Sequence, residues 1–129
     1  MKYLKYRPTN LRVMGRDYIV IFEKEATFKS STAGLCDNQK MIITILDEQH
    51  PVEELDTVIH ELLHSLWHQM SMGEHPPEEE VLVRKTAGGL TQVFMDNPHF
   101  IKYISLIDNP TNQQVIKFIS RLDNSSRTK

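Results

Sequence analysis

The sequence predicts an α+β fold in which a small β-sheet comes first and helices follow. Two apolar segments rich in β-branched residues, Asp17–Phe22 and Met41–Leu46, are predicted to be strands. From residue 51 onward, apolar residues recur every three or four positions, as in amphipathic helices. The chain of 129 residues has the usual length of one domain. We therefore expect a single compact domain over 1–129, mainly β in 1–50 and mainly helical in 51–123.

The composition argues against several classes of protein. Fifteen Lys and Arg residues against 17 Asp and Glu give a net charge of -2, so a nucleic-acid partner is not expected. No stretch approaches the roughly 18 consecutive apolar residues that a membrane helix requires. The basic N-terminal segment also lacks the apolar core of a signal peptide. We expect a cytoplasmic protein with no membrane partner and with its single cysteine, Cys36, reduced.

The two predicted strands are separated by turn-forming residues. Residues 30–34, Ser-Ser-Thr-Ala-Gly, are typical of a turn, and Cys36–Lys40 is predicted to be a hairpin connection into the second strand. The second strand, Met41–Leu46, is almost entirely apolar. We expect it to be buried on both faces or to lie close to a catalytic cleft.

Two longer helices are predicted to follow the strands. The first begins at Pro51, because proline suits a first helical turn, and ends near Gly73. Its core-facing stripe is Leu55, Ile59, Leu62, Leu66 and Met70. The second opens with the acidic residues 78–80, and its predicted buried face is Val83, Ala87, Leu90 and Phe94.

The C-terminal third contains a duplicated signal for the start of a helix. The tripeptide Asp-Asn-Pro occurs at 96–98 and again at 108–110. Asp or Asn can cap a helix, and proline fits its first turn. We therefore expect two short helices, the second ending at Leu122, and a disordered tail over 124–129.

Residues 60–64, in the middle of the first predicted helix, are His-Glu-Leu-Leu-His. Residues four apart differ by about 40° around a helix axis and about 6 Å along it, so His60 and His64 can reach one ion. Zinc accepts neutral histidine nitrogen, and a catalytic site takes three protein ligands and a water. Glu61 lies beside this face, where its carboxylate can act as general base on zinc-activated water. The motif therefore predicts one Zn²⁺ ion.

Several residues can supply the third ligand. His68 lies about 12 Å along the helix from His60, too far to share one small ion. Glu79 and Glu80 on the second helix can each offer a carboxylate, although acidic residues at a helix start also serve as caps. Glu80 is favoured over Glu79 because it is in register with the predicted buried face of that helix. His75 is a reserve candidate, since the chain can turn back toward the metal after the first helix.

The chain resembles small, often phage-encoded zinc metallopeptidases that are related in pattern to the ImmA/IrrE type and other minimal gluzincins. The resemblance runs from Tyr18–Phe22 through Gly34–Asp37 and the His60–His64 motif to Ala87–Pro98. Leu63 departs from the pattern, because ImmA/IrrE-type relatives usually have glycine there. SprT-like proteins are the neighbouring alternative.

The resemblance implies a zincin-like fold and an endopeptidase that acts on a protein or peptide in the host cytoplasm, if the chain is phage-encoded. It also implies a glutamate, Glu80 or Glu79, as the third zinc ligand. Zinc would then polarise the scissile carbonyl while Glu61 deprotonates the water. In zincins an edge strand commonly holds an extended peptide, and Met41–Leu46 is the candidate.

Two alternatives stay open at this point. The first is a zincin-fold regulatory or binding protein whose metal is structural or whose activity is lost, although a structural site has no need of Glu61. The second is a DNA-associated SprT-like protease, which a basic N-terminal run would fit, although the overall acidity weakens this hypothesis. That run consists of Lys2, Lys5, Arg7, Arg12 and Arg16.

Overall fold

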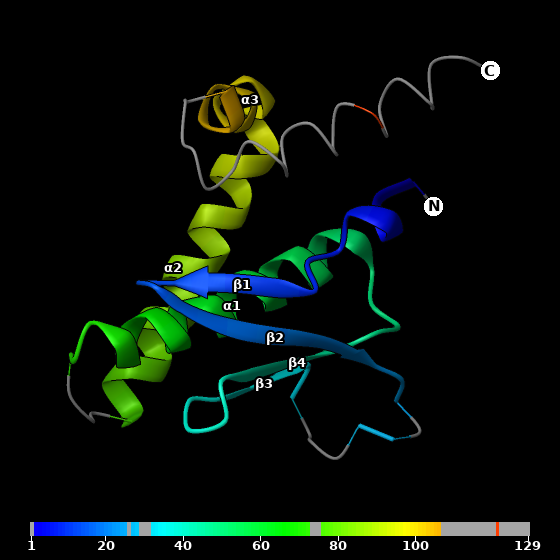
Figure 1. Ribbon diagram of the computed structural model, residues 1–129. Helices are drawn as coiled ribbons and strands as arrows, with labels where there is room; N and C mark the ends of the chain where they lie inside the picture. The colour runs from blue at the N-terminus through cyan, green and yellow to red at the C-terminus, as the bar shows by residue number, and fades with distance from the viewer. Residues whose placement is uncertain (1, 26, 29–31, 73–75, 107–120, 122–129) are drawn as a thin grey trace. The chain divides into compact units, whose positions relative to one another are not determined.

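The computed structural model describes residues 2–25, 27–28, 32–72, 76–106 and 121 (Figure 1). In chain order its elements are a 3₁₀ helix η1 (Lys2–Tyr6), the strands β1 (Asn10–Val13), β2 (Arg16–Glu23), β3 (Gly34–Asp37) and β4 (Ile42–Leu46), and the helices α1 (Pro51–Gln69), α2 (Pro76–Asp96) and α3 (Pro98–Leu106). A small sheet precedes the helices, so the predicted α+β fold class is confirmed. Among the described residues, no helix has the length and apolar content that a bilayer crossing requires.

The chain divides into two compact units. One unit is Pro8–Val93, which contains the sheet, α1 and most of α2. The other combines Met1–Arg7 with Phe94–Lys129 and contains η1 and α3. The single domain over 1–129 stays a prediction. The expected helix after Pro110 lies outside the described residues except at position 121, and the tail over 124–129 lies wholly outside them.

The described strands form one sheet with the order β1-β2-β4-β3 (Figure 1). The outer pairs β1–β2 and β3–β4 are antiparallel, whereas the central strands β2 and β4 are parallel. β4 therefore has a neighbour on each side, and β1 and β3 are the two edge strands within the described residues. The expectation that Met41–Leu46 is the edge strand is wrong, because the hairpin folds Gly34–Asp37 back along it.

The hairpin turn lies at residues 38–41, slightly later than predicted. The Asp37 carboxylate accepts hydrogen bonds from the backbone N–H groups of Gln39 and Lys40, at 3.0 and 2.9 Å. Aspartate commonly stabilises turns in this way. Met41 completes the reversal with a φ of 56°. As a result β3 and β4 pair closely, with Cys36 opposite Ile43.

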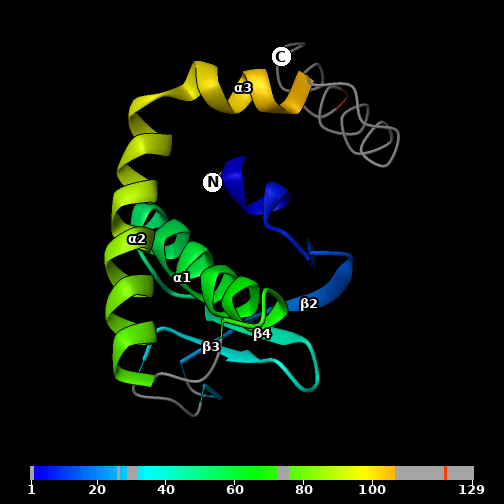
Figure 2. The ribbon, with the colours of Figure 1, turned by 90° about the vertical axis from the view of Figure 1, so that its left-hand side faces the viewer.

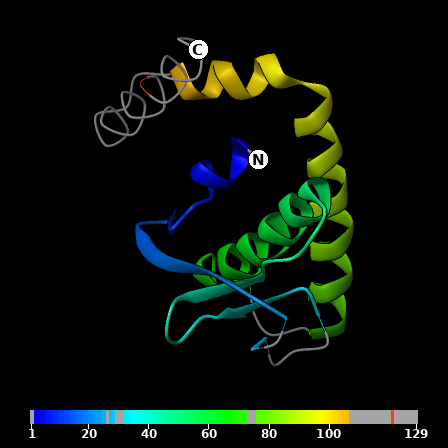
Figure 3. The ribbon, with the colours of Figure 1, turned by 90° about the vertical axis from the view of Figure 1, so that its right-hand side faces the viewer.

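The core of the Pro8–Val93 unit lies between one face of the sheet and α1, which runs along that face (Figures 2 and 3). Its buried side chains are Val13, Tyr18, Val20, Ile43 and Ile45. In β4 the buried residues alternate with partly exposed ones, so the strand is buried on one face rather than both. Removing these apolar side chains from water is the main stabilising contribution to such a core.

Helix α1 begins at Pro51, as predicted, and the His50 ring caps it by accepting a hydrogen bond from the Val52 N–H at 3.3 Å. The helix ends at Gln69, before the predicted stop. Met70 follows the last helical residue and is 52 % exposed, so its predicted place in the core is wrong. The start of α1 thus depends on local signals that the sequence makes visible.

Candidate metal centre

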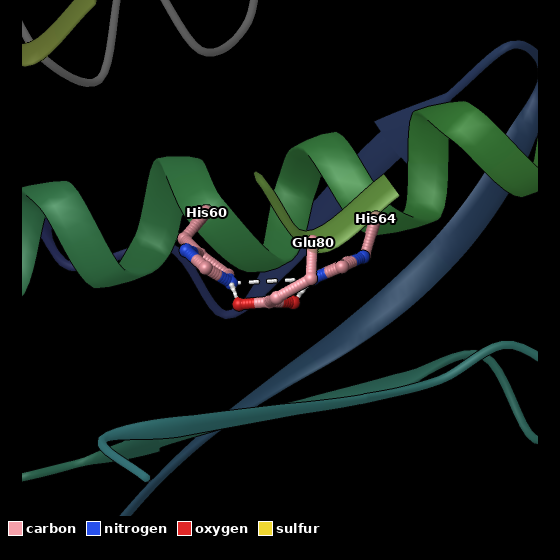
Figure 4. A group of neighbouring side chains, drawn as sticks. All are labelled: His60, His64 and Glu80. Carbon is pink, nitrogen blue, oxygen red and sulfur yellow. Dashed lines mark hydrogen bonds and ion pairs between the residues drawn. The ribbon is translucent and has the colours of Figure 1, made fainter. Parts of the chain in front are cut away.

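The two motif histidines lie one turn apart on α1 and face the same way (Figure 4). The Nε2 atoms of His60 and His64 are 3.2 Å apart, and the ring centroids are 4.9 Å apart. This is the arrangement that the four-residue spacing predicts for a helix. Helix α1 therefore offers two imidazole nitrogens to one point in space.

Glu80 reaches the same point from α2 (Figure 4). Its Oε1 lies 3.1 Å from His60 Nε2, and its Oε2 lies 2.9 Å from His64 Nε2. The Arg84 guanidinium, one turn further along α2, lies 3.6 Å from Oε1 and is 70 % exposed. Glu80 is thus the carboxylate that the fold brings to the Nε2 atoms of both histidines.

The donor set of His60, His64 and Glu80 fits a zinc ion. A tetrahedral zinc ion with ligands at about 2.0–2.1 Å separates neighbouring ligand atoms by about 3.3 Å. The closest distances between donor atoms of these three residues are 2.9, 3.1 and 3.2 Å. Among the described residues, they form a group whose possible ligand atoms all lie within 4.8 Å of one another.

Glu79 contacts the other nitrogen of the His64 ring. Its Oε2 lies 2.6 Å from His64 Nδ1. In the tautomer with its proton on Nδ1, the ring donates to this carboxylate, and the Nε2 lone pair then points toward Glu80 and His60. Histidines that bind metals usually donate their second N–H in this way. The two predicted glutamates therefore occupy different places, one on each edge of the His64 ring.

Burial sets the ionisation of the other two motif residues. Burial lowers the pKa of His60, although the nearby Glu80 carboxylate opposes this, so the neutral imidazole is favoured. Burial raises the pKa of the Glu61 carboxyl to about 7; the charge of Glu80 adds to the rise, and His64 opposes it. Glu61 is only 6 % exposed. The motif thus combines a neutral ligand with a carboxyl held largely out of water.

Glu61 lies against the start of the edge strand at Gly34. A Cβ atom on Gly34 would stand 2.9 Å from both Cγ and Oε2 of Glu61, and 2.8 Å from Thr57 Cγ2. Strand β3 therefore approaches α1 so closely that only glycine fits without a shift. This role of Gly34 was not predicted from the sequence. The available signal is an isolated glycine in a strand, which often marks close backbone approach.

Two cavities lie beside the three donor residues and adjoin β3. The larger, about 350 Å³, extends from His64 and Glu79 to Leu35, Cys36 and Asn38. The smaller, about 240 Å³, extends to positions 32–33, 56–57 and 84. Both cavities are also lined by Thr32, Gly34, His60, Glu61 and Glu80. We call the two adjoining cavities the groove; the larger borders β3 and all three donor residues, and the smaller borders His60 and Glu80 and extends to Arg84.

Of the other two histidine candidates, the structure describes only His68. His68 is exposed near the end of α1, and the reserve ligand His75 lies outside the described residues. Cys36 is half-buried in the larger cavity, and burial is the main factor that raises the pKa of its thiol to about 12. It is therefore a protonated thiol rather than a thiolate.

Comparisons with protein-family models, curated proteins and solved structures give no match to this chain. The resemblance to ImmA/IrrE-type and SprT-like proteins stays a prediction from the motif and its surroundings.

Proposed function

We propose that the protein is a zinc-dependent endopeptidase whose ion is held by His60, His64 and Glu80. The observation that carries this proposal is the convergence of three donor residues from two helices, with closest distances of 2.9–3.2 Å. Nitrogen and oxygen donors at these spacings suit zinc. Their position in a groove rather than in a closed core favours a catalytic role over a structural one, because structural zinc sites are closed.

Glu61 is the proposed general base. When bound, zinc would polarise the scissile carbonyl and activate a water for attack. Glu61 follows the first ligand directly in α1 and lines both parts of the groove. Its carboxylate can accept the proton of the attacking water and deliver it to the leaving amine. Burial against β3 limits its rotamers, which keeps it on the groove side of the helix.

The groove supports an extended peptide as the substrate. Within the described residues, β3 pairs only with β4, so no strand lies along its other edge; at the start of β3 the Gly34 carbonyl accepts a hydrogen bond from Thr32 Oγ1 at 2.9 Å. An extended chain can add to such an edge through main-chain hydrogen bonds. The larger cavity borders all three donor residues, and the smaller one continues from His60 and Glu80 to Arg84. We infer that a bound peptide extends in both directions from the cleaved bond, which favours an endopeptidase over an exopeptidase.

The two alternative functions have less support. A regulatory or binding protein with a structural metal would not need a buried carboxylate beside an accessible groove. A DNA-associated role would depend on the N-terminal basic residues, but Arg12 pairs with Asp17 at 3.6 Å, and the groove itself is lined by several carboxylates.

A peptide library tests the proposed activity without knowledge of the natural substrate. Wild-type protein loaded with zinc and the Glu61→Gln variant are incubated with peptides from a digested proteome, and new termini are identified by mass spectrometry. We expect internal cleavages with the wild type only, at equal zinc content of the two proteins. No cleavage by the zinc-loaded wild type, or equal cleavage by both proteins, would show that the proposal is wrong.

A further inference from the structure

Asn38 follows the edge strand β3 and lines the larger cavity of the groove, as His64 and Glu79 also do. Its side chain is half-buried. A carboxamide carries a carbonyl oxygen at one end and two N–H donors at the other. The hydrogen bonds around Asn38 determine which end faces the cavity.

A buried tyrosine orients this amide. Tyr18 on β2 is fully buried, and its hydroxyl accepts a hydrogen bond from Gln69 Nε2 at 3.0 Å. The hydroxyl has one proton of its own, which it donates to Asn38 Oδ1 at 2.8 Å. The carbonyl end of Asn38 is therefore directed toward Tyr18.

A second donor contacts the same oxygen. Cys36 Sγ lies 3.4 Å from Asn38 Oδ1. Because burial raises the pKa of the Cys36 thiol to about 12, the sulfur carries its proton and can donate it. Two donors from separate strands thus face one end of the amide, and the N–H donors of Nδ2 are at the other end.

The Nδ2 end has no protein partner in the part of the chain that the structure describes. The cavity it lines also contains the carboxylates of Glu61, Glu79 and Glu80. Carboxylates disfavour a carbonyl oxygen nearby and favour N–H groups, which agrees with the orientation set by Tyr18. The groove therefore contains two oriented donors that a ligand can use.

We propose that the Asn38 side chain donates a hydrogen bond from Nδ2 to a backbone carbonyl oxygen of the peptide in the groove. This inference rests on the proposed endopeptidase function and adds a substrate-binding residue to it. A backbone carbonyl is an acceptor that every peptide presents. β3 ends at Asp37, so Asn38 is the first residue beyond the strand. Its side chain can therefore donate to a peptide that pairs with β3 and extends past the end of the strand.

Binding of an uncleaved peptide measures this contact directly. The probe is the library peptide that wild type cleaves fastest, labelled with a fluorophore and titrated with zinc-loaded Glu61→Gln protein. In that background, Asn38→Asp keeps an oxygen for Tyr18 but loses the donors and adds a negative charge. A neutral hydrogen bond contributes about 0.5–1.5 kcal/mol. We expect Asn38→Ala to raise the Kd by about 3- to 10-fold, and Asn38→Asp to raise it further.

Gln39→Ala is the matched control, because Gln39 is exposed in the same turn and its backbone N–H, not its side chain, bonds to Asp37. Tyr18→Phe removes the hydroxyl that orients the amide, so it should weaken binding less than Asn38→Ala does. Circular dichroism and zinc content establish that each variant is folded. If Asn38→Asp does not fold, Asn38→Ala supports the same comparison.

The outcomes separate this inference from the proposed function. Asn38 variants that bind the probe as tightly as Gln39→Ala would overturn the inference and leave the peptidase proposal standing. A library in which zinc-loaded wild type cleaves nothing would overturn both. Weaker binding by both Asn38 variants, with normal zinc content, is the result expected.

Discussion

Glu79 Oε2 lies 2.6 Å from His64 Nδ1, on the ring edge opposite the nitrogen that faces Glu80. The side chains of His64 and Glu79 are 17 % and 20 % exposed, so water competes little for this hydrogen bond. Carboxylates in this position fix the tautomer and orientation of a metal-binding histidine. In the proposed zinc site, Glu79 would therefore act through His64 rather than by direct contact with the ion.

Replacing Glu79 should therefore weaken zinc binding without abolishing it. Loss of such a partner typically costs 10- to 100-fold in metal affinity. We expect Glu79→Ala to raise the zinc Kd by about that factor, measured by competition with a chromogenic chelator. Glu78→Ala is the control, because Glu78 is an exposed acidic residue of the same helical turn. Equal zinc affinities in the two variants would show that Glu79 does not support zinc binding through His64.

Replacing any of the three donor residues should reduce zinc binding more than replacing Glu79 does. We expect purified wild type to hold about one zinc per chain, and we expect His60→Ala, His64→Ala and Glu80→Ala each to lose most of it. His75→Ala should keep it, since His60, His64 and Glu80 already complete a catalytic ligand set. Elemental analysis after dialysis measures the content. Full zinc occupancy in Glu80→Ala would contradict the assignment of the third ligand.

Zinc should also stabilise the fold, because its ligands come from α1 and α2. A ligand that binds only the folded state adds about 2.7 kcal/mol at one hundred times its Kd. We expect zinc to raise the Tm of the wild type, measured by differential scanning fluorimetry, and to leave that of His64→Ala nearly unchanged. An equal rise in both proteins would indicate binding elsewhere.

The local parts of the site could be predicted from the sequence. His60, Glu61 and His64 lie within one helical turn, so their relative directions depend only on helix geometry. The start of α1 at Pro51 was also predictable locally, because proline suits the first turn of a helix. Which residue is the third donor, in contrast, depends on tertiary packing. Glu79 and Glu80 differ by about 100° around α2, and the way α2 packs on α1 decides which one reaches the Nε2 atoms of both histidines.

The strand order was not predictable from local pattern. Met41–Leu46 has the stronger β signal, yet it lies inside the sheet, because parallel pairing with β2 and the hairpin with β3 occupy both of its edges. Gly34–Asp37 has only four residues and a weak pattern, although it forms the edge beside the groove. A long-range pairing of this kind depends on the whole core rather than on one segment.

The Cys36 thiol should react slowly in the folded, metal-free protein. Its pKa of about 12, against an ordinary 9.0, lowers the reactive thiolate fraction at pH 8 by about 1,000-fold. We expect alkylation by iodoacetamide at pH 8 to be slower by at least that factor than in the same protein unfolded in urea. Similar rates in both states would show that the thiol is neither buried nor protonated, and would remove Cys36 as a donor to Asn38.

Gly34 should be required for the position of Glu61. An added methyl group would collide with Thr57 and Glu61 at 2.8–2.9 Å. Thr57 cannot move easily, because its hydroxyl lies 3.0 Å from Gln49 Oε1 and 2.9 Å from the Glu53 carbonyl. The Glu61 side chain is the flexible neighbour, so we expect Gly34→Ala to displace its carboxylate.

A displacement of about 1 Å at a reacting group can cost about 100-fold in rate. We expect Gly34→Ala to lower kcat by about 10- to 100-fold on the selected library peptide, at unchanged zinc content. Gly89→Ala is the matched control, because nothing lies within 4 Å of a Cβ added there, inside α2. Alanine is favoured over glycine in a helix by about 1 kcal/mol, so this control should be active and slightly more stable. Equal kcat values for the two variants would show that the close approach of β3 does not position Glu61.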